Sequence, residues 1–203
     1  MRSHPEQTML LMREERFEIG NHSWSHANFR LLGPAEAEDE VTGTQRQYGI
    51  LREELEKRLN LEGGAEKPPL PARSIRVFRF PYGTCTNESL ALLAELGLPA
   101  IQWDIVSGDA APGRSARGIT ATVLSNVKPG SIIIFHANGK GRSTLEALRE
   151  LVPKLRDRGF EFAAVSELLA AGTPAAVSEC YELRPGDNLR YDRLDRRKKH
   201  GRN

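Results

Sequence analysis

Short apolar segments alternate with longer amphipathic segments along most of this sequence. The apolar segments have the length of β-strands, and the segments between them carry apolar residues at helical spacing. Consecutive parallel strands need a crossover of about a dozen residues or more, which is usually helical. The alternation therefore predicts an α/β fold built on parallel strands. We expect these strands at residues 17–19, 75–80, 99–103, 132–135 and 160–165.

The expected helices fill the stretches between these strands, and capping residues or glycines mark several of their ends. The Gly- and Pro-rich stretch at residues 60–71 and the polar stretch at residues 104–117 predict longer loops. We expect helices at residues 5–16, 35–59, about 86–97, about 119–127 and about 145–158, and a last helix that Ser166 caps.

Polar side chains follow four successive predicted strands at their carboxyl ends. In barrels of parallel strands and helices, catalytic residues come from this end of the strands. Two histidines, an arginine, carboxylates and a further histidine on one face indicate metal-assisted hydrolysis. The residues are His22 and His26, then Arg79 with Tyr82, then Asp104 to Asp109, and then His136.

The histidines at positions 22 and 26 are candidate metal ligands. A spacing of four residues brings both rings to one side of a helical turn. A catalytic zinc site takes imidazole nitrogens at about 2.0–2.1 Å and needs three protein ligands beside an open position. The pair therefore predicts two ligands of such a site, and two histidines on a solvated turn are the alternative.

Composition limits the partners of the chain. The 203 residues are 39% hydrophobic and 28% charged, which fits one packed domain. Residues 184–203 carry eight Lys or Arg and three Asp. Such a run is more often a solvated terminus than a binding surface, so we expect no nucleic-acid partner. No apolar run approaches the ~20 residues of a membrane span and no secretory signal is recognisable, so localisation and oligomeric state stay open.

Two cysteines, Cys85 and Cys180, stand far apart in the sequence and form no Cys-x-x-Cys motif. They predict neither a zinc ribbon nor a disulfide framework. The redox compartment of the protein stays open on this ground.

The polar segments resemble motifs of the polysaccharide deacetylases of the NodB-homology type, carbohydrate esterase family four. The resemblance runs from about residue 4 to about residue 170. It implies a distorted (β/α) barrel at residues 1–172, and we expect a C-terminal extension at 173–203 with a basic, disordered tail. The second to fifth family motifs resemble His22-Ser-Trp-Ser-His26, Arg79-Phe-Pro-Tyr-Gly83, Trp103-Asp-Ile-Val-Ser-Gly-Asp109 and Ile134-Phe-His136, respectively.

Two departures from the family pattern stand out. The first family motif, Thr-Phe-Asp-Asp, supplies the catalytic base and a third metal ligand, and this sequence contains no Asp-Asp pair. His4-Pro5-Glu6 resembles the helix after the second strand, so we expect a barrel that is incomplete at its N-terminal strands. Ala110 stands where the family often has Trp, which changes the expected lining of the site.

The resemblance assigns roles to the metal and acid residues. His22 and His26 are expected to bind a divalent metal, zinc being the expected ion. His136 is the expected general acid, which protonates the departing amine, although a structural core histidine is the alternative. Asp109 is expected to pair with His136 and favour its charged form, and a loop-capping Asp is the equal alternative.

The third motif supplies two further candidates. Arg79 orients the aspartate base in the family, and here we expect it to be a structural ion-pair partner. Tyr82 is expected to offer its backbone N–H to the oxyanion, and an ordinary Pro-containing turn is the alternative. Trp24 is equally expected to be a core residue or a platform for a sugar.

Two functions follow from these expectations. The first is metal-dependent hydrolysis of N-acetyl or O-acetyl groups on a polysaccharide, or of related amide C–N bonds. The second is a degenerate, non-catalytic relative that only binds glycan. If the chain is active as it stands, Asp104 and Asp109 are the nearest candidates for the missing base.

Overall fold

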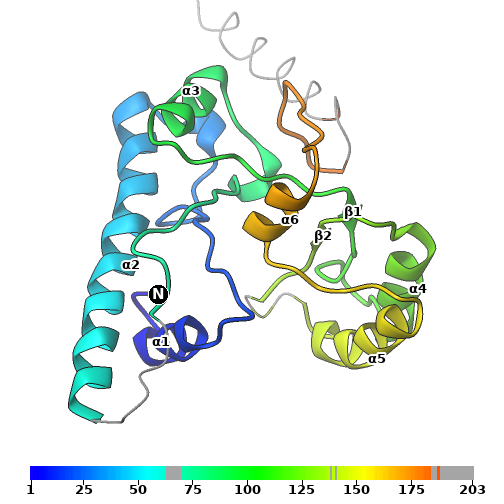
Figure 1. Cartoon of the computed structure of the whole chain (residues 1–203). Helices are drawn as coiled ribbons and strands as arrows, with labels where there is room; N and C mark the ends of the chain where they lie inside the picture. The colour runs from blue at the N-terminus through cyan, green and yellow to red at the C-terminus, as the bar shows by residue number, and fades with distance from the viewer. Residues whose placement is uncertain (63–69, 138, 140, 184–186, 188–203) are drawn as a thin grey trace, which may run out of the picture.

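Six α-helices, two 3-10 turns and two short strands form within the residues that the computed structural model describes, which are 1–62, 70–137, 139, 141–183 and 187 (Figure 1). In chain order they are α1 (Pro5–Arg13), η1 (Phe29–Leu31), α2 (Pro34–Glu62), η2 (Pro81–Gly83), α3 (Asn87–Glu95), β1 (Ile105–Val106), α4 (Ala116–Asn126), β2 (Ile133–Ile134), α5 (Thr144–Asp157) and α6 (Val165–Ala171).

Parallel backbone pairing links successive segments of the chain, as the alternation of strands and helices predicts. β1 pairs in parallel with β2, so that Ile105 lies opposite Ile133. Single parallel bridges join Asn21 to Phe78 and Phe78 to Ala100. The residues near positions 21, 78, 100 to 106 and 133 therefore form one parallel row, and the carboxyl ends of these segments face the same way.

The strands are shorter than the sequence predicts, and the described residues form no closed barrel. The segments at 75–80 and 99–103 pair only through the single bridges, and those at 17–19 and 160–165 form no strand. The carboxylate of Glu18, in the first of the latter two segments, accepts the backbone N–H of Ser166, directly after the second, at 2.9 Å. Strand β1 lies inside the stretch that was predicted to be a polar loop. The expected incompleteness of the barrel stays a prediction.

The helices follow their predicted amphipathic patterns more closely. The apolar face of α2 is buried, with Val41 fully enclosed and Leu55 3% exposed. Thr86 caps α3 together with Ser89, as the sequence indicates. Four ends were wrong: α1 stops at Arg13, α2 runs on to Glu62, α4 starts at Ala116 after the capping Ser115, and α6 starts at Val165 after Ala164. The predicted loop at 60–71 lies mostly outside the described residues, and α2 runs to its beginning.

Three apolar clusters hold the elements together. One packs α1 against α2, and another packs α4 and α5 against β1 at the opposite side of the molecule (Figure 1). The third contains the rings of Phe29, Phe78 and Phe80, whose centroids lie 4.9 to 5.5 Å apart in edge-to-face contacts. Each fully buried apolar side chain of this size stabilises the fold by about 1.5–3 kcal/mol. The aromatic cluster supports the backbone on either side of the candidate site.

The cysteines form a disulfide, so the sequence-based expectation about them was wrong. Cys85 and Cys180 are bonded, with their Cα atoms 5.7 Å apart. A widely spaced pair gives no local signal, because the fold alone brings its members together. Residues 180 and 181 of the expected C-terminal extension are buried. Most of the basic tail lies outside the described residues, and none of the described helices has the length and apolar character of a membrane span.

Candidate functional site

The histidine turn begins at a buried asparagine. The backbone of Asn21 donates to the carbonyl of Val77 at 2.9 Å and accepts from the N–H of Arg79 at 2.8 Å. Its side-chain amide donates to the carbonyl of Val41 in α2 at 2.9 Å, and its side-chain oxygen accepts from the N–H of Ser23 at 3.0 Å. Asn21 therefore fixes the start of the turn to the parallel row and to α2 at the same time.

Helix α2 holds the turn a second time through Glu40. Its carboxylate accepts the N–H of Ser25 at 2.8 Å and the hydroxyl of Ser25 at 2.6 Å. Burial alone raises the pKa of Glu40, but the hydrogen bonds from Ser25, Ser23 and Trp24 together outweigh burial and lower it. The backbone of the turn is left-handed at two non-glycine residues, Ser23 (φ 66°) and His26 (φ 62°).

The two rings of the turn approach each other, as their spacing predicts. The centroids of the His22 and His26 rings lie 4.9 Å apart. Nδ1 of His22 lies 2.7 Å from the carbonyl oxygen of Arg79. Because a carbonyl only accepts, Nδ1 carries the proton and Nε2 keeps its lone pair, which is the tautomer that a metal-binding histidine needs.

The surroundings of His22 favour its neutral form. Burial lowers the pKa of His22 most, and the charges of His26, Arg79 and His136 lower it further, against the hydrogen bond to the Arg79 carbonyl. His136 is therefore close enough to His22 to act on it electrostatically. Metal binding requires neutral imidazoles, so this environment suits a ligand.

The two histidines lack a third partner among the described residues. No group of three or more His, Cys, Asp or Glu side chains there is arranged to hold a metal ion. A catalytic zinc site has three protein ligands. His22 has a tautomer that suits a divalent metal and its ring lies close to that of His26, but the two histidines make up only part of a ligand set.

A histidine and a carboxylate face each other at the carboxyl ends of β1 and β2. Nδ1 of His136 lies 2.8 Å from Oδ1 of the buried Asp109, and the backbone N–H of His136 donates to Oδ2 at 2.7 Å. The Thr144 hydroxyl donates to Oδ2 at 2.7 Å and that of Ser107 to Oδ1 at 3.1 Å. Burial raises the pKa of Asp109, but the hydrogen bonds from Thr144 and His136 outweigh it and lower the pKa.

The sequence left two roles open for Asp109, pairing with His136 and capping a loop, and the structure shows contacts of both kinds. It pairs with the imidazole ring, and it also caps backbone and hydroxyl donors of its surroundings. The ring of His136 donates through Nδ1 and keeps Nε2 for another partner. Since four donors occupy the two oxygens of Asp109, this carboxylate is a poor candidate for a general base.

Asp104 lies at the other end of the same strands. Its carboxylate accepts the N–H of Ile132 at 2.8 Å and the hydroxyl of Ser131 at 2.9 Å. These contacts join the amino ends of β1 and β2, whereas His136 follows the carboxyl end of β2. The expectation that Asp104 could replace the missing base was therefore wrong.

The turn at η2 presents an unused backbone donor. Tyr82 (φ 59°) and Gly83 (φ 60°) are both left-handed. Within the described part of the chain, the neighbouring N–H groups of Gly83 and Thr84 have acceptors but that of Tyr82 has none. The Tyr82 ring lies edge-on to His26, with 4.8 Å between centroids. The residue expected to supply the oxyanion donor thus has its side chain next to a candidate metal ligand.

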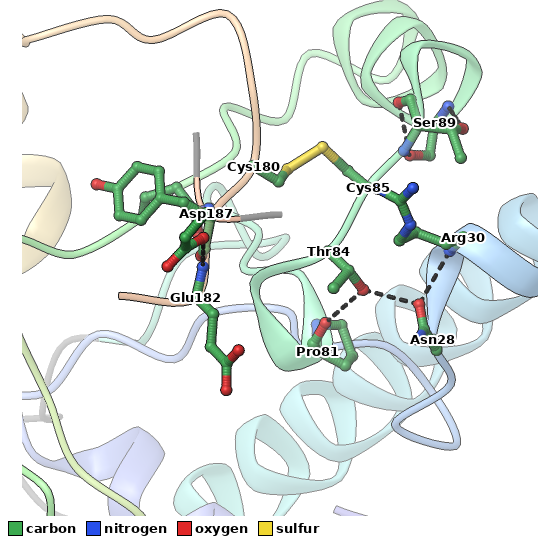
Figure 2. Close-up of a disulfide and its surroundings, with 12 residues drawn as sticks. Asn28, Arg30, Pro81, Thr84, Cys85, Ser89, Cys180, Glu182 and Asp187 are labelled. Atoms are coloured by element: carbon green, nitrogen blue, oxygen red, sulfur yellow. Dashed lines mark hydrogen bonds between the residues drawn. A yellow bond between two sulfur atoms is a disulfide. The ribbon is translucent and has the colours of Figure 1, made fainter. Parts of the chain in front are cut away.

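A hydrogen bond ties this turn to the histidine turn. The hydroxyl of Thr84 donates to the side-chain oxygen of Asn28 at 2.7 Å, and that oxygen also caps η1 by accepting the N–H of Arg30 (Figure 2). Asn28 lies two residues after His26 of the histidine turn, and Thr84 directly follows the last residue of η2. The contact fixes the separation of the two turns.

Arg79 is placed differently from its sequence-based expectation. Its guanidinium donates to the carbonyl of Ile101 at 3.3 Å and lies over the ring of Trp103 at 5.6 Å. Burial lowers the pKa of Arg79, and no carboxylate in the described residues forms an ion pair with it. Within the described part of the chain, the predicted structural ion pair of Arg79 is therefore not formed.

Sequence comparison identifies the family. No family model matches the sequence. The chain is 31% identical over 167 residues to a chitooligosaccharide deacetylase of Bradyrhizobium sp. (strain ANU 289), an alignment that covers 76% of this chain and 67% of the relative. The chain belongs to the polysaccharide deacetylase family. A second family member, the peptidoglycan-N-acetylglucosamine deacetylase of Bacillus cereus, is 30% identical over 152 residues, which cover 74% of this chain and 48% of that one.

Solved structures support the fold of a polysaccharide deacetylase. The peptidoglycan deacetylase PdaC of Bacillus subtilis gives a TM-score of 0.63 at 24% identity over 97% of this chain and 77% of that one. A pseudoenzyme of carbohydrate esterase family four from Bacillus anthracis gives 0.62 at 23% identity over 83% of this chain and 51% of its own length. At these identities the likeness concerns the fold alone. The chain spans between half and about three quarters of these family members.

Several residues that build this deacetylase-family site were not found from the sequence. They are Asn21, Asn28, Glu40, Thr84, Ser107, Thr144 and Tyr181. Asn21 and Thr84 stand directly beside a motif and Ser107 lies inside one, so only these three could have drawn notice. Trp24 is 42% exposed and rests against Gly43 of α2, so the structure leaves its role as a sugar platform a prediction.

Proposed function

We propose that this chain carries the metal-binding and proton-donating parts of a polysaccharide deacetylase centre that hydrolyses N-acetyl groups of a glycan. The observation that carries the proposal is the gathering of His22, His26, Tyr82, whose N–H has no acceptor among the described residues, and the His136–Asp109 pair at one end of the parallel row. These groups correspond to the steps that amide hydrolysis requires.

The proposed substrate is an acetylated polysaccharide. Relatives of this chain are named chitooligosaccharide and peptidoglycan deacetylases, so the shared chemistry is the N-acetyl group of an amino sugar. Hydrolysis adds water across the C–N bond and gives acetate and a free amine. An O-acetyl group, which leaves as an alcohol, is the alternative substrate within the same proposal.

A divalent metal, for which zinc is proposed, fits the two histidines in part. Nε2 of His22 and a ring nitrogen of His26 would hold it, since Nδ1 of His22 is bound to the Arg79 carbonyl. Such an ion supplies Lewis acidity toward the acetyl carbonyl and lowers the pKa of bound water. The third ligand has to come from a residue outside the described set.

The remaining steps belong to residues of this chain. The N–H of Tyr82 points from a rigid, left-handed turn and would donate to the oxyanion as the carbonyl becomes tetrahedral. His136 would give a proton from Nε2 to the departing nitrogen when the C–N bond breaks. The carboxylate of Asp109 accepts Nδ1–H, so it would orient the ring of His136 and fix its tautomer.

The described residues supply no general base for the proposed centre. None of the described carboxylates stands free beside the two histidines, and general-base catalysis contributes about 10²–10⁴-fold to rate. We therefore propose that the chain of 203 residues binds zinc weakly and hydrolyses acetylated glycans at or near background. The alternative, a relative that only binds glycan, is favoured by the same missing carboxylate.

Zinc binding and acetate release test the proposal together. Zinc should bind the wild type and be lost in His22→Ala and in His26→Ala. His4→Ala removes a histidine at the start of α1 and is the matched control, which should bind zinc like the wild type. Robust zinc-dependent acetate release by the unmodified chain would contradict the proposal that the chain lacks a catalytic base. Binding of chitooligosaccharide without zinc binding would favour the non-catalytic alternative.

A further inference from the structure

The C-terminal residues 180–183, which we call the strap, are bonded covalently beside the candidate site. Cys180 forms the disulfide with Cys85, which stands two residues after the last residue of η2 (Figure 2). Asp187 then accepts the N–H groups of Glu182 and Leu183 at 2.9 and 2.6 Å. The disulfide thus attaches the start of the strap to the residues after η2, and Asp187 closes a turn at its end.

The strap forms two hydrogen bonds with Trp103 of the parallel row, one with its backbone and one with its side chain. The hydroxyl of Tyr181 donates to the backbone carbonyl of Trp103 at 2.6 Å, and the indole N–H of Trp103 donates to the carbonyl of Glu182 at 3.0 Å. The rings of Tyr181 and Trp103 meet edge-to-face with 6.2 Å between centroids. Both side chains are buried. The position of the indole is therefore set by the strap.

Trp103 in turn supports the backbone that orients a candidate metal ligand. Its ring lies under the guanidinium of Arg79, and the carbonyl of Arg79 accepts the Nδ1–H of His22. The strap also touches η2 directly, because a Cβ on Gly83 would collide with the carbonyl of Tyr181. The strap thus contacts η2 directly and is linked to the histidine turn through Trp103 and Arg79.

We propose that Tyr181 is a positioning residue of the candidate site: through Trp103 and Arg79 it fixes the ring orientation and tautomer of His22, and it supports the turn of Tyr82. The proposal rests on the proposed function, since it assigns Tyr181 to the same centre. Tyr181 touches no reacting group. Loss of its hydroxyl leaves the buried Trp103 carbonyl without that donor, so the indole and Arg79 are free to shift.

Tyr181→Phe in the full chain is the direct test, and Tyr48→Phe is its matched control. Tyr48 is also buried and its hydroxyl also donates to a backbone carbonyl, that of Ala72 at 3.0 Å, within the α1–α2 cluster. Both variants lose one equivalent hydrogen bond. Thermal melting, zinc titration and the NMR signals of the His22 ring nitrogens should be measured for both variants and for the wild type.

We expect Tyr181→Phe to weaken zinc binding about threefold and to shift the His22 ring signals. Loss of a direct outer-shell partner costs roughly 10- to 100-fold in metal affinity, and Tyr181 lies further out. Tyr48→Phe should change neither quantity. If both variants melt earlier but keep wild-type zinc affinity and His22 signals, Tyr181 only stabilises the fold and the proposal is overturned.

Two further comparisons separate a failure of the proposed function from a failure of the proposal for Tyr181. If the wild type binds no zinc, the proposed function fails, but the His22 signals still decide whether Tyr181 positions that ring. If Tyr181→Phe does not fold, the double variant Cys85→Ser, Cys180→Ser releases the strap by another route and should shift the same signals. Unchanged His22 signals in the folded double variant would also overturn the proposal.

Discussion

Nδ1 of His136 donates to Asp109 across 2.8 Å, and the same carboxylate accepts the backbone N–H of His136. One buried side chain therefore orients both the ring and the peptide of the candidate acid. This arrangement makes Asp109 important for folding as well as for the proposed chemistry.

Asp109→Asn should destabilise the protein by about 1–3 kcal/mol near neutral pH, because the amide cannot accept from all four donors. The folded state lowers the pKa of Asp109 from its ordinary value of 3.8. Its stabilising effect is therefore complete above that value and is lost as the pH falls through the lower, folded pKa. Denaturant unfolding of wild type and variant should show the difference at neutral pH, and the difference should shrink in strong acid. A difference that does not depend on pH would contradict the charge as its cause.

Supplying the absent base should restore activity. An N-terminal extension that carries a family Thr-Phe-Asp-Asp segment should raise acetate release from chitin oligomers by about 10²–10⁴-fold. In that longer protein, His136→Ala should remove most of the gain, because the departing amine then lacks its proton donor. Asp104→Asn, at the opposite end of the strands, is the matched control and should keep the gain. Equal activity of the extended and unextended chains would show that the base is not what limits this chain.

Glu40→Gln should weaken zinc binding by about tenfold, since the carboxylate holds Ser25 between the two histidines. Glu36→Gln is a control in the same helix, where a carboxylate accepts the N–H of Gly33 at 2.8 Å. That variant should change helix stability and leave zinc binding as it is. Zinc titration of both variants separates the anchoring of the histidine turn from a general effect on α2.

Gly141→Ala should destabilise the protein by about 1–3 kcal/mol through overpacking. A Cβ there would lie 2.6 Å from Oδ2 of Asp109 and 2.8 Å from the carbonyl of His136. Gly49→Ala, in α2 with no atom within 4 Å of the added methyl, should instead stabilise the protein by about 0.5–1 kcal/mol. Thermal melting of the two variants should therefore move in opposite directions.

The sequence predicts the helices better than the strands, for a physical reason. The apolar face of α2 is encoded within the helix itself, from Val41 to Leu59, so local spacing reveals it. A strand exists only where a neighbour supplies hydrogen bonds, and the apolar run at 160–165 has no such neighbour in the part of the chain that the structure describes. β1 forms where the pattern looked like a loop, since Asp104 binds Ile132 and sets the register with β2.

The residues of the candidate site also fall into two groups, those found from the sequence and those found only from the structure. His22, His26, Arg79 and His136 stand in motifs of adjacent residues and were found from the sequence. Glu40, Thr144 and Tyr181 reach the site from distant elements, so their contacts depend on the packing of whole helices and of the strap. Local patterns carry no information about such partners.

Three residues of the site, Ser23, His26 and Tyr82, keep a left-handed backbone without being glycine. Each such conformation costs of order 1–3 kcal/mol, and the surrounding structure has to impose it. The site is therefore the place where the fold stores strain, and Glu40, Asn28 and the disulfide lie where they oppose its release. Glycine at position 23 would relieve part of this strain and raise stability, but the two imidazoles would then sample more orientations. For this protein, a stiffer site and a more stable chain are opposing demands.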